Sequence, residues 1–340
     1  MLPRRPVLLG LIPTFAILLS AFASEPTPEP PPWAYGFKTP PPPGTPQVPP
    51  AKAPPAPTDP TRFGLPGTDR AFTRAEILDI FAPPDYYPDD HPAPPPIVSH
   101  GKAPGVWACA RCHYANGKGR PENAGLAGLP VDYFIEQMHA FRDGARASSD
   151  PRKGNTPLMI EFARGMSNEE IRAAAKYYGA MKWTPWIRVV ESERVPQTTV
   201  SAGMYLQVPD GGDEPLGNRI IEVPEDAGAV EIQRSPRVGF IAYAPVGSIA
   251  RGEAFVTNGG GKTVACAACH GANLRGLTVL GMGSTPGLAG RSPSYLVRQL
   301  FDIKTGKRSG KRVELMKPVV ANLTSDDMLA IAAYLASRTP

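Results

Sequence analysis

Two short stretches of the chain carry the residue types and spacing that attach a cofactor. Residues 109–113 read Cys-Ala-Arg-Cys-His, and residues 266–270 read Cys-Ala-Ala-Cys-His. This spacing is that of covalent c-type haem attachment, because two thiols three positions apart lie on one helical turn and each forms a thioether with a haem vinyl group. The histidine that follows, His113 or His270, then presents a ring nitrogen to the iron from the same side.

The two motifs use every cysteine of the chain, namely Cys109, Cys112, Cys266 and Cys269. A thioredoxin-like pair, a zinc site and two short disulfides are the alternatives for such pairs. Two copies, each with histidine directly after the second cysteine, favour haem over these alternatives. The sequence therefore predicts two covalently bound haem c groups.

The N-terminus has the layout of an export signal. Two arginines precede the apolar run Val7–Ala23, which ends in Ala-Phe-Ala, so residues 1–23 are predicted to be a cleaved signal peptide. An uncleaved membrane anchor is the alternative, but the run is short for a span. We expect a periplasmic or otherwise exported protein, or one anchored by this segment to the outer face of the inner membrane.

The charge balance gives no sign of a nucleic-acid partner. The chain has 36 Lys and Arg against 31 Asp and Glu, and loss of the two arginines within residues 1–23 leaves 34 against 31. No basic block is interleaved with aromatic residues. The 43 prolines and 34 glycines instead indicate that part of the chain is linker.

Residues 97–183 and 247–340 are repeats of each other and are the predicted haem domains. Each has Gly-Leu-Ala-Gly after its motif, and four further residues recur at an offset of 162. These pairs are Tyr133 with Tyr295, Gln137 with Gln299, Gly144 with Gly306, and Arg146 with Arg308. Duplication is the economical explanation.

Both repeats are predicted to be mostly helical. Ser167 and Glu170 form a capping-box pattern, and apolar residues at helical spacing follow it. Thr324 caps the corresponding helix of the second repeat.

The rest of the chain differs in character. Residues 184–246 are predicted to be a β-rich insert between the haem domains, with strand-like runs at 186–190, 198–208, 219–223 and 238–244. Residues 24–96 are predicted to be a Pro-rich extension, extended and disordered up to about residue 66, with one short helix over 73–81.

Two methionines are the candidate sixth ligands of the irons. Met159 and Met316 each lie 50 residues after the first cysteine of their own motif, just before the capped helix. A thioether ligand favours ferrous iron and raises its reduction potential. The alternative for each is ordinary packing in the core, which is what most methionines do.

Other residues fit a symmetrical pair of ligands less well. Met166 aligns with Leu323, which cannot ligate, and Met282 has no partner methionine in the first repeat. Ligation by a second histidine would require His91, His100 or His139.

The two repeats resemble class I cytochrome c domains, and their tandem is similar to the periplasmic two-haem cytochromes of the c-four type. The resemblance rests on the two haem motifs, the two Gly-Leu-Ala-Gly turns and the methionine followed by a capped helix. It implies a mostly α fold with two helical haem domains, irons held by histidine and methionine, and one-electron transfer.

The chain departs from that family in two places. The family places a proline before the Gly-Leu-Ala-Gly turn, where its carbonyl accepts the N–H of the proximal imidazole. Pro286 matches in the second repeat, but the first repeat has Ala124. A backbone carbonyl at Ala124 can still accept this hydrogen bond, and we expect the two haems to differ in potential through this contact. The β-rich insert and the long N-terminal extension are further departures.

The predicted function is an exported carrier of single electrons between respiratory or dehydrogenase partners. It needs no catalytic residue and no small-molecule substrate, because the redox chemistry belongs to the iron. One alternative is a haem subunit of a larger membrane-associated dehydrogenase or oxidase complex. A di-haem peroxidase is another, and it requires an open iron position and a nearby acid–base group.

Overall fold

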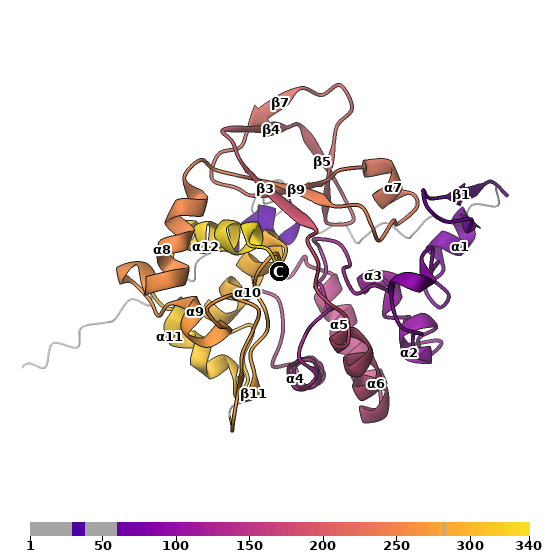
Figure 1. Cartoon of the computed structure of the whole chain (residues 1–340), viewed down its shortest axis with the longest axis horizontal. Coiled ribbons are helices and arrows are strands. Elements are labelled where there is room, and N and C mark those ends of the chain that lie inside the picture. The colour runs from indigo at the N-terminus through magenta and orange to yellow at the C-terminus, as the bar shows by residue number, and fades with distance from the viewer. Residues whose placement is uncertain (1–28, 38–59, 282) are drawn as a thin grey trace, which may run out of the picture.

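The computed structural model describes residues 29–37, 60–281 and 283–340. Two helical repeats lie side by side, and the strands of the insert lie above and between them (Figure 1). The predicted fold class, mostly helical with a small β-rich insert, is confirmed. The predicted signal peptide over residues 1–23 lies outside the described residues.

The first repeat forms its core where two of its longer helices pack against each other. Its helices are α2 (Pro96–Ser99), α3 (Ala110–His113), α4 (Val131–Arg142), α5 (Asn155–Gly165) and α6 (Asn168–Gly179). Phe134 of α4 stacks on Tyr178 of α6 with ring centroids 6.3 Å apart. The predicted capping box starts α6, since Ser167 and Glu170 exchange side-chain-to-backbone hydrogen bonds.

The second repeat packs around a helix that is buried on nearly every face. Its elements are α8 (Ser248–Asn258), η3 (Gly259–Gly261), α9 (Cys266–His270), β10 (Thr278–Val279), β11 (Gly283–Ser284), α10 (Pro293–Lys304), η4 (Val313–Met316), α11 (Lys317–Val320) and α12 (Ser325–Ser337). Thr324 caps α12 as predicted. A Cβ at Gly252 of α8 would collide with the carbonyl oxygen of Ala330, so glycine lets α8 approach α12 closely.

The insert is a small mixed sheet with two hairpin-like pairs. Its elements are β3 (Ile187–Glu191), β4 (Arg194–Pro196), β5 (Thr198–Ser201), β6 (Met204–Gln207), β7 (Asp213–Pro215), β8 (Ile221–Pro224), α7 (Ala227–Glu231) and β9 (Phe240–Ala244). β9 pairs parallel to β3 and antiparallel to β8. The run predicted at 198–208 is a hairpin rather than one strand, because Ala202 and Gly203 adopt positive φ and turn the chain.

Part of the predicted disordered extension is folded onto the second repeat. The helical turn η1 (Pro32–Tyr35) is buried, and the Tyr35 hydroxyl donates to Asp302 of α10 at 2.8 Å. Arg298 of the same helix donates to the carbonyl oxygen of Ala34 at 2.6 Å. The expectation of an extended chain weighed the prolines but not the aromatic residues between them, which supply enough apolar surface to dock.

The segment before the first repeat is also folded. It contains β1 (Arg62–Gly64), β2 (Ala71–Thr73), α1 (Arg74–Leu78) and η2 (Pro88–Asp90). Leu65, Tyr86 and Tyr87 pack with Ala229 of the insert in one apolar cluster. The extension therefore fastens the insert to the first repeat, which a flexible tether does not do.

A pH-sensitive contact holds this segment on α6. The His91 side chain is 2% exposed, contacts Asp85 at 3.3 Å and lies 3.0 Å from the Tyr177 hydroxyl. Burial lowers the pKa of His91, but the Asp85 carboxylate and the Pro92 carbonyl outweigh burial and raise that pKa above its ordinary value. The folded protein therefore holds this proton more tightly than the unfolded chain does.

Raising the pH through the folded pKa of His91 is expected to weaken the first repeat. The stabilisation is complete below the unfolded pKa of about 6.5 and is lost above the raised folded pKa. The free energy of unfolding should fall by on the order of 1 kcal/mol between pH 6 and 8. Urea unfolding at both pH values measures this fall, and His91→Gln should abolish the part due to this residue. An equal fall in the variant would contradict the assignment.

Candidate haem sites

The first haem motif lies on α3 at the edge of an apolar cavity. His113 is buried, and its Nδ1–H donates to the carbonyl oxygen of Ala124 at 2.8 Å. Burial lowers the pKa of His113, so the imidazole is neutral. A neutral ring whose Nδ1 is held by a carbonyl leaves Nε2 as the free ligand atom.

The second motif repeats this arrangement on α9. The Nδ1–H of His270 donates to the carbonyl oxygen of Pro286 at 2.9 Å, and burial lowers the pKa of this imidazole as well. The alanine at position 124 therefore supplies the acceptor that proline supplies in the second repeat, at nearly the same distance. The backbone carbonyl at this position thus accepts in both repeats, and the expected difference between the two potentials stays a prediction.

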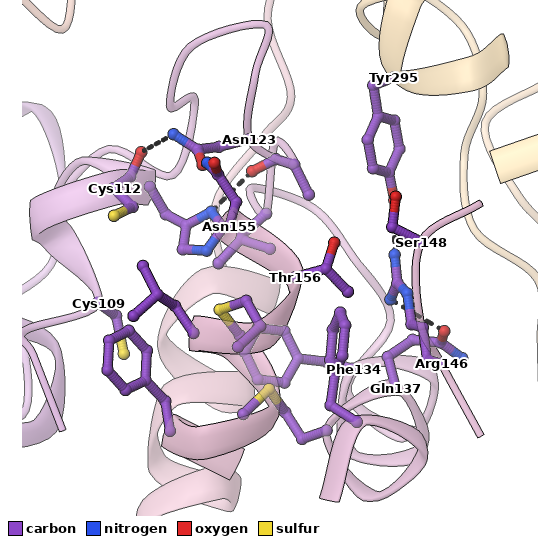
Figure 2. A pocket seen from close by; sticks show the side chains of 18 of the residues that line it. Cys109, Cys112, Asn123, Phe134, Gln137, Arg146, Ser148, Asn155, Thr156 and Tyr295 are labelled. Atoms are coloured by element: carbon purple, nitrogen blue, oxygen red, sulfur yellow. Dashed lines mark hydrogen bonds between the residues drawn. The ribbon is translucent and has the colours of Figure 1, made fainter. Parts of the chain in front are cut away.

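The thiols of each motif lie on one side of their cavity. Figure 2 shows Cys109 and Cys112 together, across the pocket from Arg146 and Gln137. The four cysteines form no disulfide. Burial raises the pKa of Cys109 to about 12 and that of Cys266 to about 11, so both are protonated thiols. A structural zinc site needs four ligands, and no group of three or more His, Cys, Asp or Glu side chains within residues 29–37, 60–281 and 283–340 is placed to hold a metal ion.

Each cavity brings a predicted methionine together with a predicted histidine. The first cavity, of about 160 Å³, is lined by His113 and Met159, and the second, of about 290 Å³, by His270 and Met316. Met138 and Met166 also line the first cavity. Ligation by Met159 and Met316 thus stays a prediction. Met282 lies outside the described residues.

The other histidines of the described chain line neither cavity. His91 is held by Asp85 and Tyr177, and His100 is exposed beside Ser99. His139 lies on α4 outside the set of cavity-lining residues. No histidine besides the proximal one therefore meets either cavity within residues 29–37, 60–281 and 283–340.

The two cavities share a polar wall built from both repeats. Tyr133, Gln137, Tyr295 and Gln299 line both cavities, whereas Arg146 lines the first and Arg308 the second. These six residues are hereafter the shared wall. Arg146 donates to the side-chain oxygens of Gln137 at 3.0 Å and Gln299 at 2.8 Å. Arg308 donates to the same two oxygens at 2.9 Å each.

The shared wall contains two buried positive charges whose described side-chain hydrogen-bond acceptors carry no negative charge. Arg146 and Arg308 are 8% and 7% exposed, and their hydrogen-bond acceptors among the described side chains are glutamine and tyrosine oxygens, all neutral. A buried guanidinium without a counter-charge is costly. The carboxylates of haem propionates are the anions that these cavities would receive, so the residues present fit haem c in both sites.

The six residues of the shared wall are visible in the sequence as tyrosine, glutamine and arginine pairs at one offset. This repetition predicts a duplication but not a role at the haem sites. The residue type is the signal that could have shown the role, because an arginine that recurs at a buried position in both repeats needs a buried partner. Backbone pairing across the boundary, with Ala147 N–H donating to Lys307 at 2.7 Å, brings the two halves together.

Comparison with known proteins shows one family matched by both repeats. The family model for cytochrome c matches residues 101–181 and 249–339. The two segments contain the two repeats, each with its own haem motif. Together they make up half of the chain, and they leave the insert and the N-terminal segment unmatched.

Individual relatives are similar over a larger part of the chain. The thiosulfate dehydrogenase electron acceptor of Stutzerimonas stutzeri is 39% identical over 70% of this chain and 82% of its own. The cytochrome c4 of Pseudomonas aeruginosa is 40% identical over 67% of this chain and 82% of its own. The crystal structure of reduced cytochrome c4 from Pseudomonas stutzeri is 19% identical over 68% of this chain and 93% of its own, with a TM-score of 0.43.

Proposed function

The chain belongs to the cytochrome c family and is a di-haem electron-transfer cytochrome, and we propose that it passes single electrons from an exported dehydrogenase to a respiratory acceptor. The observation that carries the proposal is the pair of cavities joined by the shared wall. One wall between two redox sites would allow an electron to move from one site to the other within the chain.

We assign the haem contacts residue by residue. When bound, each haem supplies an iron that alternates between ferrous and ferric states. Cys109, Cys112, Cys266 and Cys269 would hold the two groups by thioethers, and His113 and His270 would ligate the irons. Met159 and Met316 would close the opposite faces, and the carbonyl oxygen of Pro286, like that of Ala124, fixes the proximal ring.

The protein itself is proposed not to be an enzyme. A di-haem peroxidase needs an acid–base group beside an open iron position. The lining residues of both cavities include no histidine other than the proximal one, and a methionine is present in each. Acid–base groups do line the first cavity, among them Glu122, Lys153 and Asp302. The proposal therefore rests on the methionine of each cavity, which would close the iron position that a peroxidase needs open.

The partner is proposed to be an exported dehydrogenase. The relative from Stutzerimonas stutzeri is named as the electron acceptor of a thiosulfate dehydrogenase, so an oxidoreductase of that class is the donor we would test first. The alternative, a haem subunit built into a larger dehydrogenase complex, draws support from the same name. The N-terminal sequence supports a periplasmic location. In the described chain, no single helix has the length and apolar character of a membrane span.

A redox titration of the purified mature protein tests the proposed function. We expect the protein to be coloured by two haems per chain and to keep these haems in acidic organic solvent. It should take up two electrons in one-electron steps. Absorbance followed against the applied potential gives the haem count and both midpoint potentials together. Loss of colour into the solvent, or uptake of a single electron, would contradict it.

A further inference from the structure

The mouth of the second cavity is rimmed by exposed apolar side chains. Leu280 is fully exposed, and Leu315, Val264 and Leu277 are 64%, 52% and 43% exposed. These four residues, hereafter the apolar rim, are four of the seven large hydrophobic side chains exposed in the described chain. Val264, Leu277 and Leu315 line the cavity, and Leu280 lies between β10 and β11. Clustered exposed apolar residues mark an interaction surface.

The thioether edge also opens at this mouth. Cys269, the second cysteine of the second motif, is exposed and lies among the residues that line the cavity. A haem edge held by this cysteine would therefore be reachable from outside. Val264, Leu277 and Leu315 of the apolar rim line the same cavity as Cys269, and Leu280 stands at the turn of the β10–β11 hairpin that Leu277 precedes. A partner can desolvate such side chains at little cost.

The corresponding edge of the first cavity is closed by the insert. Arg234 donates to the carbonyl oxygen of Arg111, within the first motif, and Asn116 donates to the carbonyl oxygen of Pro236 at 2.9 Å. Cys112 is half-buried, whereas its counterpart Cys269 is exposed. None of the exposed large hydrophobic residues of the described chain lines the first cavity. The two haem sites are thus unequal, although the repeats are similar.

The charges around the apolar rim leave a basic surplus. The paired charges balance: Lys262 and Arg251 contact Asp327 at 2.8 and 3.7 Å, Arg312 contacts Glu136 at 2.8 Å and Asp132 at 3.0 Å, and Lys317 contacts Glu314 at 2.8 Å. Arg275 and Lys311 are exposed and form no ion pair within the described residues. The charges left without a counter-ion here are both positive, so this face attracts carboxylates.

We propose that the apolar rim is the docking surface for an acidic redox protein, and that electrons enter and leave the chain through the second haem only. The first haem then exchanges electrons with the second across the shared wall and not with outside partners. This inference rests on the proposed function and adds the port and the charge of the partner. The contact would be small and salt-sensitive, as transient redox encounters are.

Stopped-flow reduction by a flavodoxin semiquinone, an acidic one-electron donor, tests the port. Leu280→Glu and Leu315→Glu place a charge on the apolar rim, and each should lower the second-order rate constant about tenfold, or about 1.4 kcal/mol. Arg275→Glu should lower it too, and the wild-type rate should fall as salt is added. Wild-type rates in both leucine variants would overturn the proposal.

Two control substitutions at exposed apolar residues outside the apolar rim show where on the surface the electron donor docks. Val246→Glu changes an apolar residue that is 67% exposed and lines neither cavity, and its rate should stay within twofold of wild type. Ile232→Glu changes an exposed residue of the insert next to Arg234, on the closed side, and its rate should also be unchanged. A rate loss in Ile232→Glu equal to that in Leu280→Glu would place the port at the first haem instead.

A reductive titration separates this proposal from the proposed function. With excess dithionite every variant should take up two electrons, since the variants alter docking and not the haem sites. If all variants take up two electrons and are reduced at the wild-type rate, the proposed docking surface is wrong and the proposed function stands. A wild-type protein that takes up no electrons overturns the proposed function.

Discussion

Changing Met316 to alanine is expected to abolish the near-red sulfur-to-iron charge-transfer band of the second haem. It should also lower the midpoint potential of that haem by on the order of 0.1–0.3 V, a fraction of the ~0.8 V that axial ligands span. The reason is that a thioether ligand favours ferrous iron, whereas the methyl group of alanine cannot ligate the iron. Met159→Ala should act likewise on the first haem. Near-infrared absorbance and a redox titration measure both effects.

The first cavity offers matched controls for this experiment. Met138 and Met166 are buried and line the same cavity as Met159. Met166→Ala should keep the band and the potential but lower the free energy of unfolding by about 2–5 kcal/mol, the cost of truncating a buried methionine. If Met166→Ala lost the band and Met159→Ala retained it, the ligand would have to be reassigned to Met166.

The haem motifs and the capped helices were predictable because their signals are local. Each motif needs five consecutive residues, and each capping box needs four, as in Ser167–Glu170 and Thr324–Asp327. The structure places both proximal histidines and both predicted methionines at cavities. Short-range geometry follows from residue order, so no knowledge of the fold was needed.

The shared wall and the docking of η1 were not predictable because they join distant residues. Arg308 reaches Gln137 across 171 positions, and Tyr35 reaches Asp302 across 267. No periodicity links such partners, and a lone aromatic pair among prolines carries no helical or strand pattern. The insert was predicted as β-rich, but its short strands β4 and β7 and the helix α7 were missed, since three to five residues give too weak a pattern.

Removing one guanidinium from the shared wall is expected to affect both stability and potential. Arg146→Leu deletes donors to Gln137 and Gln299 and leaves the carboxylates of bound haem without their buried counter-charge. Breaking a buried charged contact in this way costs about 3–5 kcal/mol. Loss of a positive charge also stabilises ferric iron, so the midpoint potential of the first haem should fall. Urea unfolding followed by haem absorbance and a redox titration measure the two effects.

Three companion variants show whether charge or hydrogen bonding is responsible. Arg146→Lys keeps the charge but not the forked geometry, so it should retain the potential while losing part of the stability. The double variant with Arg308→Leu should deviate from additivity by about 0.5–3 kcal/mol, because both guanidiniums share two glutamine oxygens. Arg172→Leu removes an exposed ion pair with Glu169 and should leave the free energy of unfolding nearly unchanged. Strict additivity, or an Arg146→Leu cost as small as that of Arg172→Leu, would mean that the wall does not balance the charge of the haem groups, and the joining of the two redox sites would lose its physical basis.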